Sequence, residues 1–300
     1  MVSFEKVKKL FIFLIIFSWN IIFWIKFSSN FEENKRLSQL YTLLQKELFK
    51  EIKKFKFENK VSLVVKDLRN PFFKVYFREN VCVPAASLIK LPVVCAVFKA
   101  FLEGKINLEE KYLVRKKDIS WGSGVLKKFK LPYEVTYKKL IELSITESDN
   151  TATNILIKRV GFKFINQAFK EWGLKNSKLN KLILSNAKKE NFTSASDISQ
   201  LLSLIYYKKI LTPQICKKII HLLINQKIND RLPKYLPKTV IVAHKTGLEK
   251  GALHDAGIVF LPQREYLICI LTQKNKNYKR AKEFIAHISK VVFKEYEKFF

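Results

Sequence analysis

The sequence predicts an α+β domain, in which strands from both ends of the chain share one antiparallel sheet and helices occupy the middle. Two runs rich in β-branched and aromatic residues, 61–66 and 72–77, flank the turn pair Asn70-Pro71 and are typical of a hairpin. Three more such runs and a closing helix follow near the C-terminus: 240–243, 256–261, 266–272 and 278–299. Strands that gather at the two ends of a chain favour α+β over an alternating βαβ arrangement.

The central part of the chain alternates helical spacing of apolar residues with polar loops. A long apolar run begins at Ser87 and ends near Gly104, as a helix followed by a glycine C-cap does. Five more helices are predicted in this part: 137–145, 151–160, 164–172, 196–207 and 213–225.

Composition excludes several classes of protein. The chain has 300 residues, of which 48% are hydrophobic and 13% aromatic, so it can bury a large core and is not globally disordered. Its 8 Gly and 8 Pro exclude collagen-like and low-complexity sequences. The 4 Cys form no Cys-x-x-Cys pair, so neither a zinc knuckle nor a disulfide framework is predicted.

The net charge of +30 would attract phosphates, acidic polymers and anionic lipid. The lysines are spread along the whole chain, and no zinc-finger, RRM or basic-zipper pattern is present. We therefore expect a solvated lysine-rich surface and no nucleic-acid partner. Binding to an acidic polymer of the cell envelope is favoured over binding to nucleic acid.

The N-terminus predicts export. Lys6, Lys8 and Lys9 precede an apolar run from Leu10 to Ile25, which is the layout of a secretory signal or a signal anchor. The run is slightly short of the roughly 20 residues of a comfortable membrane span, and no clean cleavage site follows it. We expect residues 1–29 to anchor an exported protein on the periplasmic side of the cell envelope, with a cleaved signal peptide as the alternative. Residues 30–56 are expected to form a charged helical linker to a monomeric domain at 57–300.

Three short motifs stand out, in this order: Ser87-Leu88-Ile89-Lys90, Ser148-Asp149-Asn150 and Lys245-Thr246-Gly247. Each has an ordinary structural interpretation when it is taken alone. The first two resemble helix N-caps, and the third resembles the end of a strand. The first motif gains meaning from its context, because residues three apart at the start of an apolar helix share one face. The hydroxyl of Ser87 would there lie near unpaired backbone N–H groups and the positive end of the helix dipole.

The ordered triple resembles the motif set of class A β-lactamases and penicillin-binding proteins. The similarity extends to the flanking stretches 84–92, 142–154 and 244–259, and it covers about residues 60–297. It implies a five-stranded antiparallel sheet with flanking helices, an all-helical second lobe, and an active site in the cleft between them.

The resemblance also implies a role for each motif residue. Ser87 would be the nucleophile of an acyl-serine intermediate, and Lys90 would accept its proton if burial and the second cation Lys245 lower the pKa of Lys90. Ser148 would pass the proton to the leaving nitrogen. The substrate would be held by the remaining motif residues: Asn150 on its amide side chain, Lys245, Thr246 and Gly247 on its carboxylate side, and the backbone N–H groups of Ser87 and Leu248 as the oxyanion hole.

The sequence departs from the class A pattern at the residue that releases the acyl group. Those enzymes carry a Glu-x-x-Leu-Asn loop whose Glu activates the deacylating water, whereas this chain has Ile183 or its neighbour at that place. Glu190 is a possible substitute, but a surface role in the loop is favoured. We therefore expect a β-lactamase-like serine hydrolase that acylates readily and deacylates slowly on β-lactams or related amides. The alternatives are a D,D-peptidase or penicillin-binding protein that acts on cell-wall peptides, a β-lactam sensor without turnover, and a catalytically dead relative.

No metal or cofactor is expected. The four histidines, His221, His244, His254 and His287, show no His-Glu-x-x-His or equivalent ligand spacing. His254 beside Asp255 is interpreted as a loop pair, since no Gly-x-Ser-x-Gly elbow accompanies it.

Overall fold

The structure is a computed structural model, and it describes residues 30–300. The predicted anchor at 1–29 lies outside the described residues. Within residues 30–300, no helix combines the length and the apolar character that a membrane span needs.

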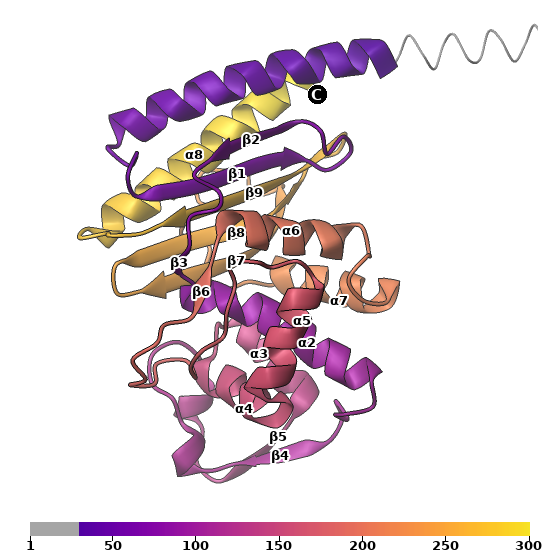
Figure 1. The fold of residues 1–300 in the computed structure, drawn as a ribbon, viewed down its shortest axis with the longest axis vertical. Coiled ribbons are helices and arrows are strands. Elements are labelled where there is room, and N and C mark those ends of the chain that lie inside the picture. Colours follow the sequence, from indigo (N-terminus) through magenta and orange to yellow (C-terminus); the bar gives the residue numbers. More distant parts are fainter. Residues whose placement is uncertain (1–29) are drawn as a thin grey trace, which may run out of the picture.

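A five-stranded antiparallel sheet forms the centre of the fold, as predicted (Figure 1). Its strands, in the spatial order β2-β1-β9-β8-β7, are Lys74–Phe77, Val61–Asp67, Glu265–Thr272, Ala252–Phe260 and Ile241–Glu249. β1 pairs with β9 along its whole length, so the two ends of the chain meet in one sheet. β7 is the edge strand at the side of the helical lobe.

Two expectations about these strands were wrong. Lys245-Thr246-Gly247 does not end β7 but lies inside it, because β7 and β8 pair continuously from Ile241↔Phe260 to Glu249↔Ala252. His254 and Asp255 lie inside β8 and are fully buried, so they are not a loop pair. A Gly reverses the chain between the two strands: Gly251 has φ +75°, a value that favours glycine.

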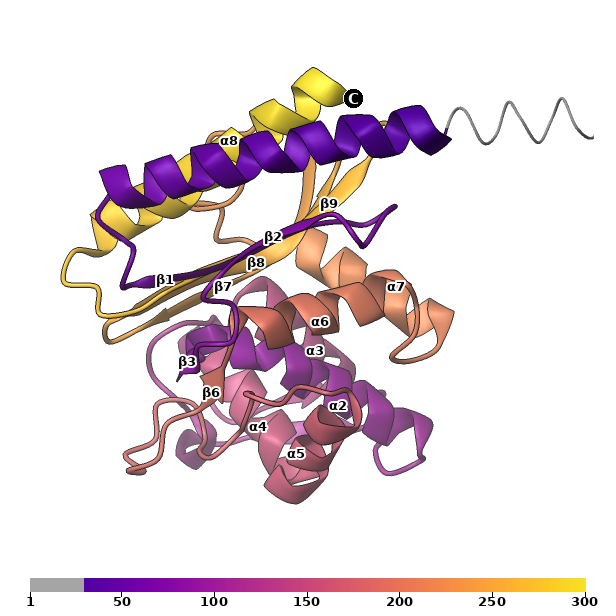
Figure 2. The same ribbon diagram turned by 45° about the horizontal axis from the view of Figure 1, so that its top comes forward.

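The outer face of the sheet is covered by two long helices, one from each end of the described chain (Figures 1 and 2). These are residues 30–54 and α8, Tyr278–Phe299. The predicted N-terminal helix is present, and its apolar stripe is buried in the same core as the outer side of the sheet: Leu37, Leu40, Leu44, Leu48 and Ile52. The segment expected as a linker is therefore also a layer of the folded domain.

The inner face of the sheet carries the remaining helices, all of which the sequence predicted. α6 (Ala195–Tyr206) and α7 (Pro213–Ile224) lie nearest the sheet, and α2 (Lys90–Leu102) leads into the lobe of α3, α4 and α5 (Figure 2). The three lobe helices are Tyr137–Thr146, Asn150–Val160 and Phe162–Glu171. Polar side chains cap several of them, as when Thr136 accepts a hydrogen bond from the N–H of Lys139 at the start of α3.

The second lobe is not purely helical, which corrects the expectation drawn from the resemblance. It also carries an antiparallel pair formed by β4 (Lys111–Val114) and β5 (Tyr133–Thr136), together with the short 3-10 turns η2 (Lys116–Asp118) and η3 (Leu126–Lys128). Both strands include Tyr and Val, residues that favour extended structure.

A second small pair holds the chain in front of α2. β3 (Val83–Pro84) pairs with β6 (Phe192–Thr193), and the N–H of Ala85 donates to the carbonyl of Asn191 over 2.8 Å. The 3-10 turn η1 (Ala86–Ile89) follows and leads directly into α2. The stretch that contains Ser87 is thus tied to the loop before β6.

Candidate active site

Ser87 lies within η1, and neither η1 nor α2 has a side-chain N-cap. The interpretation of Ser87 as a simple helix cap is therefore wrong. Ser87 is half-buried and lines a cavity of about 190 Å³ together with Asn150, Ile183 and Leu248. The cavity lies where η1, the start of α4, the loop before β6 and the end of β7 meet.

Two buried lysines converge on Ser148. The Nζ of Lys90 donates to the carbonyl of Ser148 over 2.5 Å and lies 3.2 Å from its Oγ. The Nζ of Lys245 donates to the same Oγ over 3.0 Å, and both lysines are 0% exposed. One hydroxyl therefore connects an amine from α2 with an amine from β7, although Ser148 and Lys245 are 97 residues apart in the sequence.

Burial lowers the pKa of both amines. Burial lowers the pKa of Lys90 well below its ordinary value, and the charge of Lys245 lowers it further, against the opposing effect of Asp149. Burial lowers the pKa of Lys245 to about 7, an effect that Asp255 opposes and Arg231 strengthens. A neutral amine at Lys90 can accept a proton from a serine hydroxyl, and a charge on Lys245 favours that neutral state.

Ser148 is held in an uncommon backbone conformation, with φ +52°. Its neighbour Asp149 supports it by capping α4 through the N–H of Ala152 over 2.9 Å. The other carboxylate oxygen of Asp149 accepts from the N–H groups of Val125 and Leu126 over 2.7 and 2.9 Å. The Asp of the motif therefore binds the 120–126 loop to α4 and does not line the cavity.

Asn150 connects the same loop to the lysine pair. Its Oδ1 accepts from the Nζ of Lys90 over 2.6 Å, and its Nδ2 donates to the carbonyl of Trp121 over 2.7 Å. Gly122, with φ +84°, passes so close that a Cβ there would lie 2.8 Å from this Nδ2. The amide of Asn150 is thus fixed in one orientation at the cavity wall.

The remaining motif residues follow one another along β7. Thr246 is buried, and its carbonyl accepts from the Nζ of Lys245 over 3.0 Å. At Gly247 a Cβ would lie 3.3 Å from the Cβ of Ala86, so glycine lets β7 approach η1 closely. Leu248 is 52% exposed at the rim of the cavity.

Arg231 is a candidate site residue that the sequence analysis missed. It is 2% exposed, its Nε has no hydrogen-bond partner within residues 30–300, and its Nη1 lies 3.1 Å from Asp230. Its charge lowers the pKa of both Lys245 and His254, which places it near the β7 side of the site. An arginine in the loop before β7 belongs to no motif, so no sequence pattern could have found it.

Two buried histidines support β7 and β8 rather than form a catalytic triad. Asp255 binds the Nδ1 of His244 over 2.8 Å, and His244 Nε2 lies 3.0 Å from the Oδ1 of Asn229. Burial lowers the pKa of His254 to about 4, so this ring is neutral. His254 Nε2 donates to the carbonyl of Pro84 over 2.8 Å and thereby fixes the chain three residues before Ser87.

The loop before β6 places an apolar side chain at the cavity. Ile183 is fixed by Asn154, whose Oδ1 accepts from the N–H of Ile183 over 2.7 Å and whose Nδ2 donates to its carbonyl over 3.1 Å. Glu190 pairs with Lys181 over 2.7 Å. The carboxyl group among the residues that line the cavity is that of Glu249, whose pKa is raised by burial and by Glu190.

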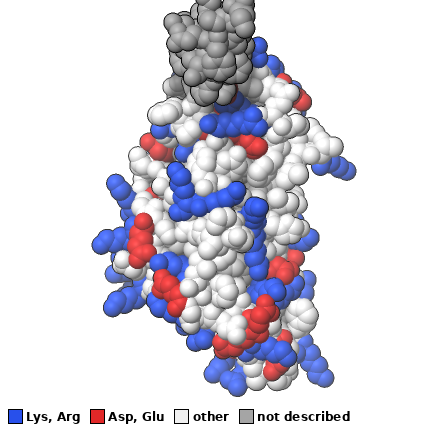
Figure 3. All heavy atoms as spheres, turned by 90° about the vertical axis from the view of Figure 1, so that its right-hand side faces the viewer, with Lys and Arg blue, Asp and Glu red and all other residues white. Residues whose placement is uncertain are grey.

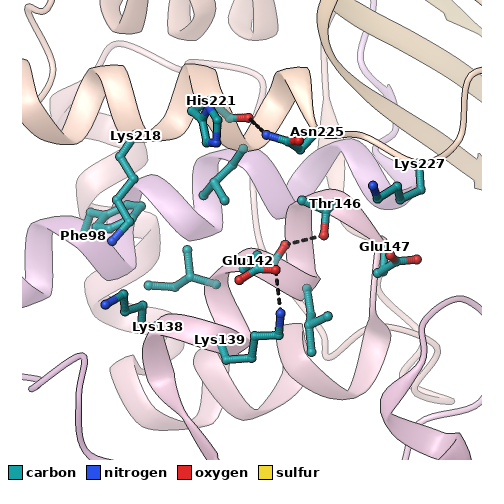
Figure 4. Close-up of a pocket in the computed structure, with 13 residues that line it drawn as sticks. Phe98, Lys138, Lys139, Glu142, Thr146, Glu147, Lys218, His221, Asn225 and Lys227 are labelled. Carbon is teal, nitrogen blue, oxygen red and sulfur yellow. Dashed lines mark hydrogen bonds and ion pairs between the residues drawn. The ribbon is translucent and has the colours of Figure 1, made fainter.

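A larger cavity, of about 480 Å³, lies elsewhere, between α2, α3 and α7 (Figure 4). Its lysines are largely engaged: Lys139 pairs with Glu142 over 2.6 Å, and Lys218 lies over the ring of Phe98 at 5.8 Å. It contains neither Ser87 nor the lysine pair. The volume of a cavity therefore does not identify the candidate active site in this protein. The convergence of the serine and lysine side chains does.

The fold and the convergent serine and lysine residues define a serine hydrolase. The model of the beta-lactamase enzyme family matches residues 43–296, and the chain belongs to this family. Beta-lactamase BRO-1 of Moraxella catarrhalis is 28% identical over 232 residues, which are 72% of this chain and 74% of that protein. Beta-lactamase VEB-1 of Pseudomonas aeruginosa is 25% identical over 233 residues, 71% of this chain and 78% of that one.

Solved structures show the same relationship. A structure of PBP-A is 30% identical, with a TM-score of 0.74 over 88% of this chain and 96% of that one. A leucine-to-glutamate mutant of PBP-A, an acyl-enzyme complex with penicillin G, is 31% identical, with a TM-score of 0.77 over 87% and 97%. The extended-spectrum beta-lactamase TLA-3 is 24% identical, with a TM-score of 0.77 over 84% and 98%, and shows the fold.

Proposed function

We propose that the protein cleaves β-lactams or related amide bonds through an acyl ester on Ser87 and releases that ester slowly. The observation that carries the proposal is the composition of the cavity: Ser87 lies three residues before a buried amine, while the side chain at position 183 of the cavity wall is an isoleucine, which cannot accept a proton.

In the proposed acylation, Ser87, Lys90 and Ser148 share the work. Lys90, neutral in its dry surroundings, accepts the proton of the Ser87 hydroxyl as the oxygen attacks the carbonyl carbon of the substrate. The Oγ of Ser148, which both lysines bind, passes a proton to the leaving nitrogen. The backbone N–H groups of Ser87 and Leu248 stabilise the oxyanion, an interaction worth about 3 kcal/mol per donor.

The β7 side of the cavity binds the substrate carboxylate. Lys245 and Thr246 contribute an ammonium and a hydroxyl, and Gly247 keeps the strand close to η1. Arg231 adds a guanidinium whose buried Nε has no hydrogen-bond partner among the described residues, a state that an incoming carboxylate would relieve. Asn150 contacts the amide side chain of the substrate from the start of α4.

Release of the acyl group needs a base that activates water, and Ile183 cannot act as one. The adduct therefore persists, and the protein behaves as an acylating hydrolase with low turnover on classical penicillins.

The natural substrate we favour is a cell-wall peptide, which makes D,D-peptidase or penicillin-binding activity the second candidate function. The supporting observation is that PBP-A is more similar to this chain, at 30–31% identity, than the β-lactamases reported above, at 24–28%. Export and attachment to the cell envelope through residues 1–29 fit this substrate, and we propose them with it.

The test is to follow intact mass and product together after adding penicillin G, a chromogenic cephalosporin and a D-Ala-D-Ala peptide. We expect a stable adduct with both β-lactams and turnover of the peptide. Rapid multiple turnover of the β-lactams without a persisting adduct would refute slow release. A stable adduct without turnover of the peptide would instead support a β-lactam sensor that does not turn over its ligand.

Ser87→Ala is the control for the nucleophile. We expect complete loss of the mass adduct with unchanged secondary structure by circular dichroism, because Ser87 makes no capping contact. Normal labelling of this variant would refute the assignment of Ser87.

A further inference from the structure

One end of the molecule presents large aromatic side chains to solvent. Phe72, at the tip of the β1–β2 hairpin, is 88% exposed, the largest value among the exposed hydrophobic residues of the described chain. Phe31, in the first turn of the described N-terminal helix, is 62% exposed. The two segments lie together, since the Nδ2 of Asn70 donates to the Oδ1 of Asn34 over 2.8 Å.

The tip is a fixed structure and not a loose loop. The Oδ1 of Asp67 accepts from the N–H groups of Arg69 and Asn70 over 2.9 and 2.5 Å. The guanidinium of Arg264 binds Asp67 and also Glu33, each over 2.5 Å, and so joins the hairpin to the start of the N-terminal helix. Phe72 is therefore held outward by its own turn, although exposure of an isolated Phe is unfavourable in water.

Positive charge surrounds these aromatic residues. Lys35, Arg36, Arg69 and Lys74 are all exposed at this end, and they are opposed by exposed Glu32 and by the 3.4 Å contact of Arg69 with Glu265. Figure 3 views the molecule from this side and shows that Lys and Arg side chains are more numerous on it than Asp and Glu. We call the set Phe31, Lys35, Arg36, Arg69, Phe72 and Lys74 the aromatic-basic tip.

The chain itself limits how far this tip can lie from a membrane. Only five residues lie between Phe31 and Ile25, the end of the apolar run that the sequence predicts as an anchor. At about 3.5 Å per residue, even a fully extended connection reaches roughly 20 Å. If the run lies in a bilayer, the tip lies at its surface.

We infer that the aromatic-basic tip is a membrane-contact surface, which docks the folded domain onto a bilayer that contains anionic lipid. Phe31 and Phe72 enter the boundary between headgroups and acyl chains, as Phe side chains of interfacial segments do, and the four cations contact lipid phosphates. The contact fixes the orientation of the domain. The β3–β6 pair in front of Ser87 lies toward the opposite side of the domain from the start of the N-terminal helix, so the cavity is held away from the lipid (Figures 1 and 2).

The test uses the full chain in nanodiscs of phosphatidylcholine with or without phosphatidylglycerol. A nitroxide is attached through Phe72→Cys in a Cys82→Ser background, because Cys82 is the exposed thiol and the other three are buried. The matched control carries the label through Phe129→Cys, since Phe129 is also exposed, at 55%, but lies in the helical lobe. Collisions with oxygen, which partitions into lipid, are compared with collisions with a water-soluble nickel chelate.

We expect the label at 72 to collide with nickel at least fivefold less often than the label at 129, and more often with oxygen. Arg36→Gln with Arg69→Gln should reduce this protection in discs that contain phosphatidylglycerol. Equal nickel collisions at both positions would overturn the inference. Protection that grows with the number of proteins per disc, without a gain in oxygen collisions, would also overturn it, because it would show a second copy at the tip.

Hydrogen exchange on the unmodified chain gives an independent measurement. Amides of residues 68–75 should exchange several-fold more slowly in discs with phosphatidylglycerol than in discs of phosphatidylcholine alone. No difference in these amides would contradict the role of anionic lipid, whatever the labelled variants show.

Discussion

The two walls of the active-site cavity differ in what they contribute. The wall formed by η1, α4 and β7 carries Ser87 and places Ser148 between two buried amines, whose donors also bind Asn150 and Thr246. The wall formed by the loop before β6 is held just as firmly, through Asn154, but it presents the apolar Ile183. Hydrogen bonds therefore hold the side chains of both walls in place, while the reactive groups are concentrated in the first wall. The comparison explains how acylation and release can be separated in one site.

The largest effect should come from Lys90→Met, which keeps the volume of the first wall and removes its base. We expect the acylation rate to fall by about 10³-fold, within the range for loss of a general base. In the parent protein the rate should rise with pH through the pKa of Lys90, which lies well below its ordinary value, because only the neutral amine accepts a proton. Stopped-flow acylation across pH measures both; a variant that retains the parent's rising limb would contradict the role of Lys90.

Ile183→Glu should give the second wall a base that can activate water and so release the acyl group. A carboxylate at this place is expected to raise the deacylation rate by about 10²-fold, the lower end of general-base effects. Loss of the penicillin adduct with time, followed by mass spectrometry, measures it. Leu184→Glu is the matched control, because Leu184 lines the same cavity but is 58% exposed. Equal acceleration in both variants would indicate a general effect of charge and not a positioned base.

Arg231→Gln tests whether the first wall extends to the loop before β7. Loss of a charge-assisted hydrogen bond of about 1.5–3 kcal/mol should raise the concentration for half-maximal acylation by roughly 10-fold or more. The maximal acylation rate should change less, since Arg231 contacts neither Ser87 nor Lys90 in the structure. A β-lactam ester without the free carboxylate serves as the control substrate, and its affinity should not depend on Arg231.

The smallest effect is a pH dependence of binding. Lys245, with its pKa lowered to about 7, is protonated below that value and loses its charge above it. Affinity for a substrate carboxylate should therefore fall by up to about tenfold between pH 6 and pH 8. Competition binding to Ser87→Ala, which cannot be acylated, measures this without interference from Lys90. Constant affinity over this interval would show that Lys245 keeps its charge.

Much of the fold could be predicted from the sequence because it depends on local periodicity. Within residues 30–300, every predicted helix and the β1–β2 hairpin are present, since apolar spacing and turn residues act over a few positions. The length of β7 could not be predicted from the sequence, because a Lys-Thr-Gly stretch becomes a strand only when β8 pairs with it. The packing of residues 30–54 was missed in part for the same reason: the stripe of leucines predicts a helix but not its partner.

For the candidate site, the sequence alone predicted Ser87, Lys90, Ser148, Asn150 and the β7 motif, because their spacing resembles that of a known family. It also determined the absence of a glutamate at Ile183. Only the tertiary structure decided that Ser148 binds both lysines, that Arg231 is buried near them, and that the His254 ring is neutral. These properties depend on burial and on charges brought together from distant parts of the chain, and burial is set by packing and not by local sequence.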